Sequence, residues 1–221
     1  MTETCSAGID RVAEISYFEP LEIHNREKPY ISNVPFVETE GPWNNLNQVH
    51  HQMPVCDIRG SDDEFVLETK GFEYVKHSFS HQPIDHIDTL SHPYVEEMEN
   101  FLKDRFGASM VFIAWKPLMK RVSEWPIAVC DTSTISVDDC HAVDTVFPHY
   151  ASELYHIGHN AAHKWFYLSE QTDEEVLLMQ IFDSDTPELP GCPHMSINVG
   201  GDSKHKGRRD SAEARAVLIY L

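Results

Sequence analysis

The chain has 221 residues, of which 41% are apolar, and this length suits one domain with a buried core better than two. Its 36 acidic and 17 basic side chains give a formal net charge of -19, which excludes nucleic acid and anionic membrane surfaces as partners. Residues 1–10 are polar and acidic and no run of eighteen apolar residues follows, so we expect neither secretion nor a membrane span. The five cysteines are odd in number and widely spread, which indicates reduced thiols and a cytoplasmic protein.

The first segment with a composition of its own covers residues 1–54. Between Ile15 and Trp43 it contains four prolines, which disfavour helix. The pattern predicts an extended N-terminal arm laid over a body, and a β domain that spans residues 55–221. At the start of that domain, residues 55–60 lead into residues 64–68 and, past residues 70–71, into residues 72–75. This pattern reads as a strand, a turn and a second strand, so a β-hairpin is predicted there.

Residues 92–106 carry the clearest helix signal. Pro93 follows the first residue, acidic side chains come early, basic ones come late, and Gly107 ends the pattern. Apolar residues recur on one face, which predicts a helix packed against a sheet through Tyr94, Met98, Phe101 and Leu102.

Short apolar segments follow this helix at intervals marked by turn residues. Such spacing is typical of an all-β barrel or sandwich, so the predicted fold class is mainly β with a few helices. The predicted strands cover residues 110–115, 125–130, 144–147, 164–168, 176–182, 195–199 and 214–220.

The C-terminal third contains the most specific candidate site. His194 opens a predicted strand, Arg209 lies fifteen positions later, and Arg215 falls on the final strand. In double-stranded β-helix oxygenases a late-strand histidine binds Fe(II), and an arginine from the next strand holds the far carboxylate of 2-oxoglutarate. The spacing suits that pairing, but a histidine that caps a strand and exposed basic residues explain it equally well.

A series of ordered segments resembles the fungal hydroxylase/desaturase family of secondary-metabolite clusters, with gibberellin-desaturase-like and cephalosporin-methoxylase-like members. The matching segments are DIRG at 57–60, EF at 64–65, GF at 71–72, PYVEEME at 93–99, GAS at 107–109, WPIAVCD at 125–131, HNAAHKWFYL at 159–168, DEEVLL at 173–178, FDS at 182–184, PH at 193–194 and RDSAEAR at 209–215. The resemblance implies a double-stranded β-helix (jelly-roll) oxygenase-like core, Fe(II) and 2-oxoglutarate as cofactors, and oxidation of a small natural product. It assigns His194 to the metal and Arg209 or Arg215 to the cosubstrate.

The sequence departs from the family between the GAS segment and the WPIAVCD segment. Family members usually carry an additional stretch there with a His-x-Asp pair, and the comparison predicts that it is deleted here at about residues 114–116, which leaves the predicted core incomplete. A facial triad needs two imidazoles and a carboxylate, so His194 alone cannot replace it. Two other sets of metal ligands are less well supported by the sequence. One is the pair His86 and Asp88, which lies before the helix, and the other is a zinc site made from residues 140–141 with residues 192–194.

Two functions are therefore expected. The first is an oxidoreductase of the non-haem Fe(II)/2-oxoglutarate type that hydroxylates or desaturates a small fungal metabolite. The second is an inactive or truncated family member that acts as a binding or assembly partner. The expected partners are a small-molecule substrate and a second copy in a homodimer, without nucleic acid or membrane. His194 is predicted to begin a strand, to point into the barrel mouth and to lie within reach of Arg209 or Arg215.

Overall fold

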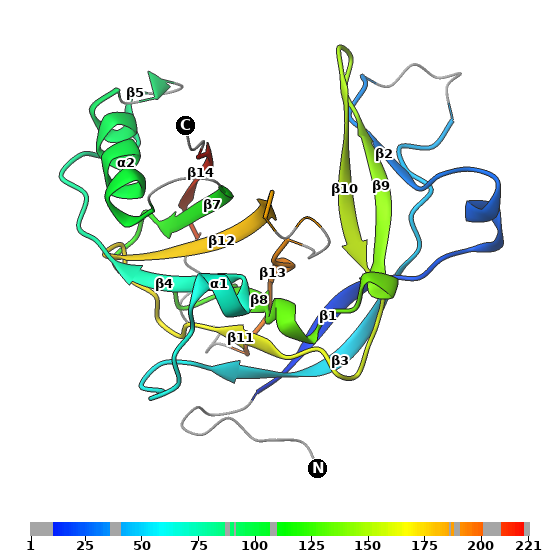
Figure 1. The fold of residues 1–221 in the computed structure, drawn as a ribbon, viewed down its shortest axis with the longest axis horizontal. Coiled ribbons are helices and arrows are strands. Elements are labelled where there is room, and N and C mark those ends of the chain that lie inside the picture. The colour runs from blue at the N-terminus through cyan, green and yellow to red at the C-terminus, as the bar shows by residue number, and fades with distance from the viewer. Residues whose placement is uncertain are drawn as a thin grey trace.

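Two β-sheets form the centre of this chain in a computed structural model that describes residues 11–35, 41–86, 89–90, 92–106, 110–185, 187, 191–200 and 209–218 (Figure 1). The first sheet has five strands in the order β1-β3-β11-β8-β13. Its members are β1 (Arg11–Phe18), β3 (Gln48–Asp57), β11 (Trp165–Tyr167), β8 (Ile127–Cys130) and β13 (His194–Ser196).

The second sheet has four antiparallel strands in the order β14-β7-β12-β4. They are β14 (Ser211–Val217), β7 (Met110–Pro117), β12 (Glu175–Asp183) and β4 (Phe72–Lys76). Strand β7 continues without a break through residues 114–116. All three of these residues pair with β14, and Ala114 and Trp115 also pair with β12.

A hydrophobic core fills the space between these two sheets. Side chains from the five-stranded sheet meet side chains from the four-stranded sheet, as expected for two sheets packed face to face. The buried members of this inner core are Cys56, Phe72, Trp115, Val122, Ile127, Val129, Phe166, Leu177, Met179 and Cys192.

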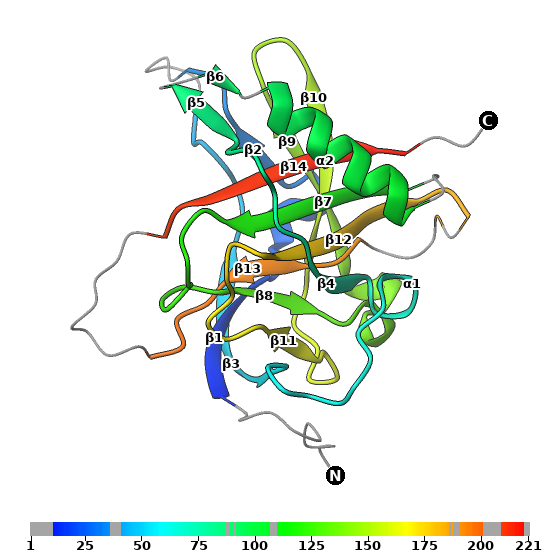
Figure 2. The same ribbon diagram turned by 90° about the vertical axis from the view of Figure 1, so that its left-hand side faces the viewer.

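Helix α2 (His92–Arg105) covers the outer face of the four-stranded sheet, where it lies across β7 and β14 in Figure 2. Tyr94, Met98 and Leu102 are buried against Val176 and Leu178, and Phe101 is partly buried beside them. The predicted helix and its apolar stripe are therefore confirmed.

A third sheet stands on the opposite side of the molecule from α2 (Figure 1). It has the order β10-β9-β2, with β10 (Ala151–Ile157), β9 (Cys140–Val146) and β2 (Tyr30–Ser32). The remaining short elements are β5 (Ile84–His86), β6 (Thr89–Leu90), α1 (Leu67–Lys70) and the 3-10 helices η1 (Glu22–Asn25), η2 (Thr132–Thr134) and η3 (Val137–Asp139).

The predicted hairpin in residues 55–75 is wrong. Residues 64–66 form no strand and lead into α1, which begins at Leu67 and ends at Gly71 with φ of 77°, a left-handed conformation that glycine adopts without strain. Strand β4 then pairs with β12 instead of turning back on β3. The local signal marked apolar segments correctly but could not show which strand each one joins.

The predicted N-terminal arm contributes directly to the core. Strand β1 pairs with β3 over its whole length, and Ile15 and Tyr17 are almost fully buried. The expected boundary between residues 54 and 55 falls inside β3. Residues 11–18 and 48–57 thus belong to the five-stranded sheet as β1 and β3.

The composition predicts reduced cysteines and no membrane span. Cys130, Cys140 and Cys192 are free thiols, whereas Cys56 is disulfide-bonded, so the expectation of reduced thiols is wrong for Cys56. In the part of the chain that the structure describes, no helix is long and apolar enough to cross a membrane.

Candidate functional site

His194 lies at the start of β13, the edge strand of the five-stranded sheet. It stands directly opposite Val129, and Ser196 stands opposite Ile127. Directly opposed residues of antiparallel strands project from the same face, and both Val129 and Ile127 belong to the inner core. His194 and Ser196 therefore project from the face that looks toward the four-stranded sheet, and His194 is exposed at its rim.

The imidazole of His194 has a fixed orientation. Its Nδ1 lies 2.9 Å from the carbonyl oxygen of Cys192. A carbonyl only accepts hydrogen bonds, so Nδ1 carries the proton and donates it. The lone pair of the neutral ring is then on Nε2, the tautomer that suits a metal ligand or a general base.

Arg209 lies just before β14 and joins the two sheets. Its Nη1 donates to the carbonyl oxygen of Trp125 at 2.5 Å and to Oγ of Ser196 at 2.9 Å. Its guanidinium carbon lies 5.4 Å from the centre of the Trp115 ring. Arg209 is half-buried, and burial lowers its pKa from the usual value.

The charge of Arg209 is not balanced by a neighbouring carboxylate in the described part of the chain. Its hydrogen-bond acceptors are a carbonyl and a hydroxyl, which are neutral. A half-buried guanidinium with free N–H groups is a strong binding group for a carboxylate, because it can donate two parallel hydrogen bonds.

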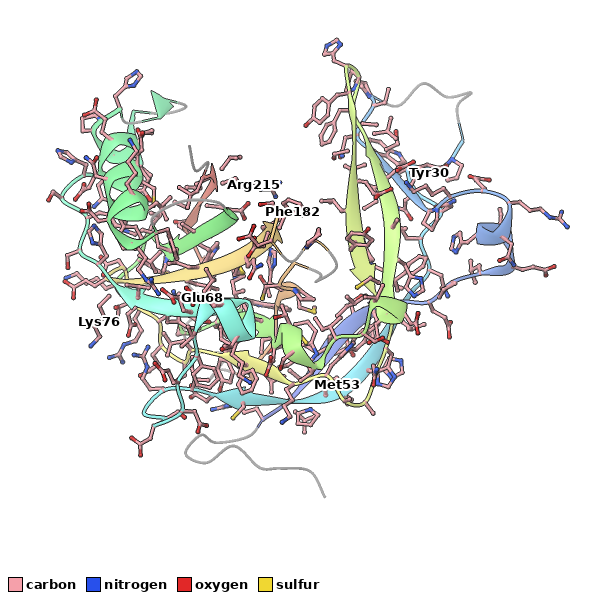
Figure 3. All side chains as sticks on the ribbon, viewed as in Figure 1. Tyr30, Met53, Glu68, Lys76, Phe182 and Arg215 are labelled. Carbon is pink, nitrogen blue, oxygen red and sulfur yellow. The ribbon has the colours of Figure 1, made fainter. Side chains whose placement is uncertain are left out.

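Arg215 is placed differently. It belongs to β14, its side chain is 69% exposed, and its Nε lies 3.1 Å from Oε1 of Glu213. Glu213 stands opposite Trp115, so Glu213 and Arg215 share the inner face of the sheet. Figure 3 shows Arg215 and Phe182 on the side of this sheet that faces the β9–β10 hairpin.

The three residues that the sequence singled out thus lie on inner faces of the two sheets. Arg209 contacts Ser196, which is two positions from His194 on the same face. Arg215 is occupied by its own ion pair with Glu213. Of the two arginines, Arg209 is the one that contacts the strand of His194, through Ser196. Their assignment to a metal and a cosubstrate stays a prediction.

Two residues of this site were missed by sequence reasoning. Ser196 orients the guanidinium of Arg209, and Trp115 provides the ring on which it lies. Every second side chain of a strand lies on the same face, so the sequence could have shown that Ser196 shares a face with His194. Nothing local in the sequence connects Trp115 with Arg209.

The described residues contain no group of three or more His, Cys, Asp and Glu side chains that could hold a metal ion. The described residues therefore form neither a complete facial triad for iron nor a zinc site from residues 140–141 with residues 192–194. The alternative ligand pair, His86 and Asp88, lies outside the described residues, because the structure describes neither Asp88 nor the side chain of His86.

The fold is built on two facing β-sheets, with His194 at the rim of one sheet and Arg209 in contact with residues of both. The family described as "Oxidoreductase/YMDC permease-like domain" matches residues 15–114 and 114–219, and the chain belongs to this family. The two matched parts meet at residue 114.

Curated relatives come from fungal secondary metabolism. The chain is 30% identical over 147 residues to an Fe(II)/2-oxoglutarate-dependent dioxygenase, nvfI, of Aspergillus novofumigatus, covering 63% of this chain and 50% of the relative. It is 26% identical over 183 residues to the hydroxylase/desaturase asaB of Aspergillus flavus, covering 75% of this chain and 79% of the relative. The matches span about half the length of the first three curated relatives.

A solved structure shares the fold. The iron and alpha-ketoglutarate-dependent endoperoxidase NvfI superimposes with a TM-score of 0.80 at 21% identity, over 95% of this chain and 97% of that chain. The predicted fold class, mainly β with a jelly-roll oxygenase-like core, is confirmed.

Proposed function

We propose that this protein is an oxidoreductase of the hydroxylase/desaturase type, related in chemistry to Fe(II)/2-oxoglutarate enzymes, that acts on a small secondary metabolite. Family membership and the names of the relatives support the reaction class. The observation that carries the proposal is the half-buried guanidinium of Arg209, which has no carboxylate partner among the described residues and contacts Ser196, two residues from His194 on the same strand face.

In this proposal Arg209 binds the far carboxylate of 2-oxoglutarate. Ser196 and the carbonyl of Trp125 hold one guanidinium nitrogen, and the remaining N–H groups are free to donate. The indole of Trp115 covers one side of the guanidinium and excludes water there. His194, with Nε2 unprotonated, is the residue that would hold iron.

The described residues do not fit a complete iron site. A facial triad uses two histidines and a carboxylate, and only His194 of such a set is placed. This observation favours a second candidate function, a family member that binds the cosubstrate without turning it over. The family match consists of two parts that meet at residue 114, and this supports the second candidate because the family pattern predicts an additional His-x-Asp stretch there.

Calorimetric titration with 2-oxoglutarate tests the role of Arg209. The variant Arg209→Met should lose about 10- to 100-fold in affinity, because a hydrogen bond to a charged group contributes about 1.5–3 kcal/mol. The variant Arg215→Met is the matched control and should bind nearly as well as the unmodified protein, because Arg215 is exposed and paired with Glu213. Equal affinity in all three proteins would contradict the assignment.

We also propose a cytoplasmic homodimer. Strand β10 is an edge of its sheet and exposes Leu154 and Tyr155, so its backbone groups are available to pair with a second copy. The free thiols of Cys130, Cys140 and Cys192 support the location, whereas the disulfide of Cys56 is unusual for it. Light scattering after size-exclusion chromatography tests the dimer, and a monomer at every concentration would contradict it. Cell fractionation tests the location.

A further inference from the structure

Lys116 lies outside the site around His194 and Arg209. It is a buried cationic side chain whose burial is not explained by an ion pair among the described residues or by packing. It follows Trp115 in β7 and therefore projects from the opposite, outer face of the four-stranded sheet. Only 5% of the residue is exposed. Lysine is almost never buried to this extent unless it is paired.

Lys116 has no ion-pair or hydrogen-bond partner in the described part of the chain. Its Nζ lies 4.6 Å from the centre of the Phe79 ring. Other lysines differ, because Lys28, Lys70 and Lys103 each contact a carboxylate at 2.7 Å or less.

A cavity of about 100 Å³ adjoins the Lys116 side chain. Phe79 forms an apolar part of its wall, Ser78 and Gln82 add neutral polar groups, and Asp173 and Glu174 stand on the acidic side. The cavity has room for a molecule of a few heavy atoms. Its acidic residues disfavour an anionic ligand.

The protonation of Lys116 follows from these surroundings. Burial lowers the pKa of its amine, and the charges of Asp173 and Glu97 oppose this effect only in part. The face of Phe79 also favours the ammonium form, but it does not replace water or a counter-ion. A larger fraction of the neutral amine, which is the nucleophile, is therefore present near neutral pH than for an exposed lysine.

We propose that Lys116 is a nucleophilic amine that binds small uncharged aldehydes in this cavity as an imine. The amine nitrogen attacks the carbonyl carbon, and the carbonyl oxygen takes up a proton to give a carbinolamine. The hydroxyl group of the carbinolamine then leaves with the remaining N–H proton as water, and the C=N bond forms. Imine formation involves no change of oxidation state and does not depend on the site around His194 and Arg209.

Reductive trapping in the intact protein tests this proposal. The protein is treated briefly with limiting glycolaldehyde and cyanoborohydride near neutral pH, and modification of each lysine is measured by peptide mass spectrometry. Lys116 should be modified several times faster than Lys120, an exposed lysine of the same segment. The comparison is made within one folded chain, and the variant Lys116→Met identifies the modified peptide.

A second aldehyde tests the selectivity of the cavity. Pyridoxal phosphate is larger and anionic, so it should modify Lys120 and spare Lys116. Modification of Lys116 by glycolaldehyde at or below the rate of Lys120 would overturn the proposal. Equal modification of both lysines by pyridoxal phosphate would overturn the assignment to small uncharged aldehydes.

Discussion

The carboxylate of Glu175 shows how one residue joins distant parts of this chain. It is buried at the start of β12 and accepts hydrogen bonds from Nη1 of Arg59 at 2.5 Å and from Nη2 at 3.0 Å. The backbone N–H and the hydroxyl of Thr172 donate to the same carboxylate. Burial alone would raise the pKa of Glu175, but these donors outweigh it and lower the pKa below its usual 4.5.

The lowered pKa of Glu175 predicts a dependence of stability on pH. A carboxyl group with a lower pKa in the folded state stabilises the fold above its unfolded pKa, and that contribution is lost as pH falls through the folded pKa. The free energy of unfolding should therefore decrease as pH falls below about 4.5. Urea denaturation between pH 3 and pH 7 measures it, and the variant Glu175→Gln should show a weaker dependence.

The exposed pair of Arg121 and Glu170 provides the control. Both side chains are at least 60% exposed, so Glu170→Gln should change the free energy of unfolding by no more than about 1 kcal/mol at any of these pH values. The same pH profile for Glu175→Gln and for the unmodified protein would show that the bond to Arg59 does not stabilise the fold.

At the scale of elements, α2 and the sheet beneath it share one hydrophobic cluster. Leu102 is 3% exposed within that cluster, whereas Val95 on the same helix is 40% exposed. The helix also makes a bridge to the sheet, because Nε and Nη2 of Arg105 donate to the buried carboxylate of Glu73 in β4. These contacts make α2 part of the folded core.

Truncation of Leu102 tests the packing of α2. Leu102→Ala should lower the free energy of unfolding by about 2–5 kcal/mol, because it removes buried methyl groups and leaves a cavity. Val95→Ala, on the exposed part of the helix, should change it by about 0.5 kcal/mol or less. Chemical denaturation measures both. Similar midpoints for the two variants would mean that the helix is peripheral.

At the scale of the whole molecule, metal binding depends on residues that must come from several elements. His194 is the single predicted iron ligand that the structure places, at the edge of the five-stranded sheet. Strand β7 passes directly through residues 114–116, where the family pattern predicts an additional His-x-Asp stretch. A transcript that encodes extra residues at this junction would establish a longer form.

An anaerobic Fe(II) titration, followed by measurement of succinate, tests this view of the whole chain. The 221-residue chain should bind Fe(II) weakly and form succinate slowly or not at all, because a single ligand fixes the ion poorly. Insertion of the predicted His-x-Asp stretch at residues 114–116 should provide both properties. His194→Ala should remove the remaining Fe(II) affinity, whereas His149→Ala, at an exposed position, should leave it unchanged. Tight one-to-one binding by the short chain would contradict the ligand count.

Composition and short periodic patterns are enough to predict the helix of residues 92–105, the buried segments that form β7, β8, β11 and β12, and the acidic charge. Strand β1 was also within reach, because Ala13, Ile15 and Tyr17 alternate with more polar residues. Only the tertiary structure decided that β4 pairs with β12, and that Arg209 contacts Ser196 and Trp115. Strand order and register arise from pairing between residues far apart in the chain, and a local pattern shows which face of a strand is apolar but not which strand lies beside it.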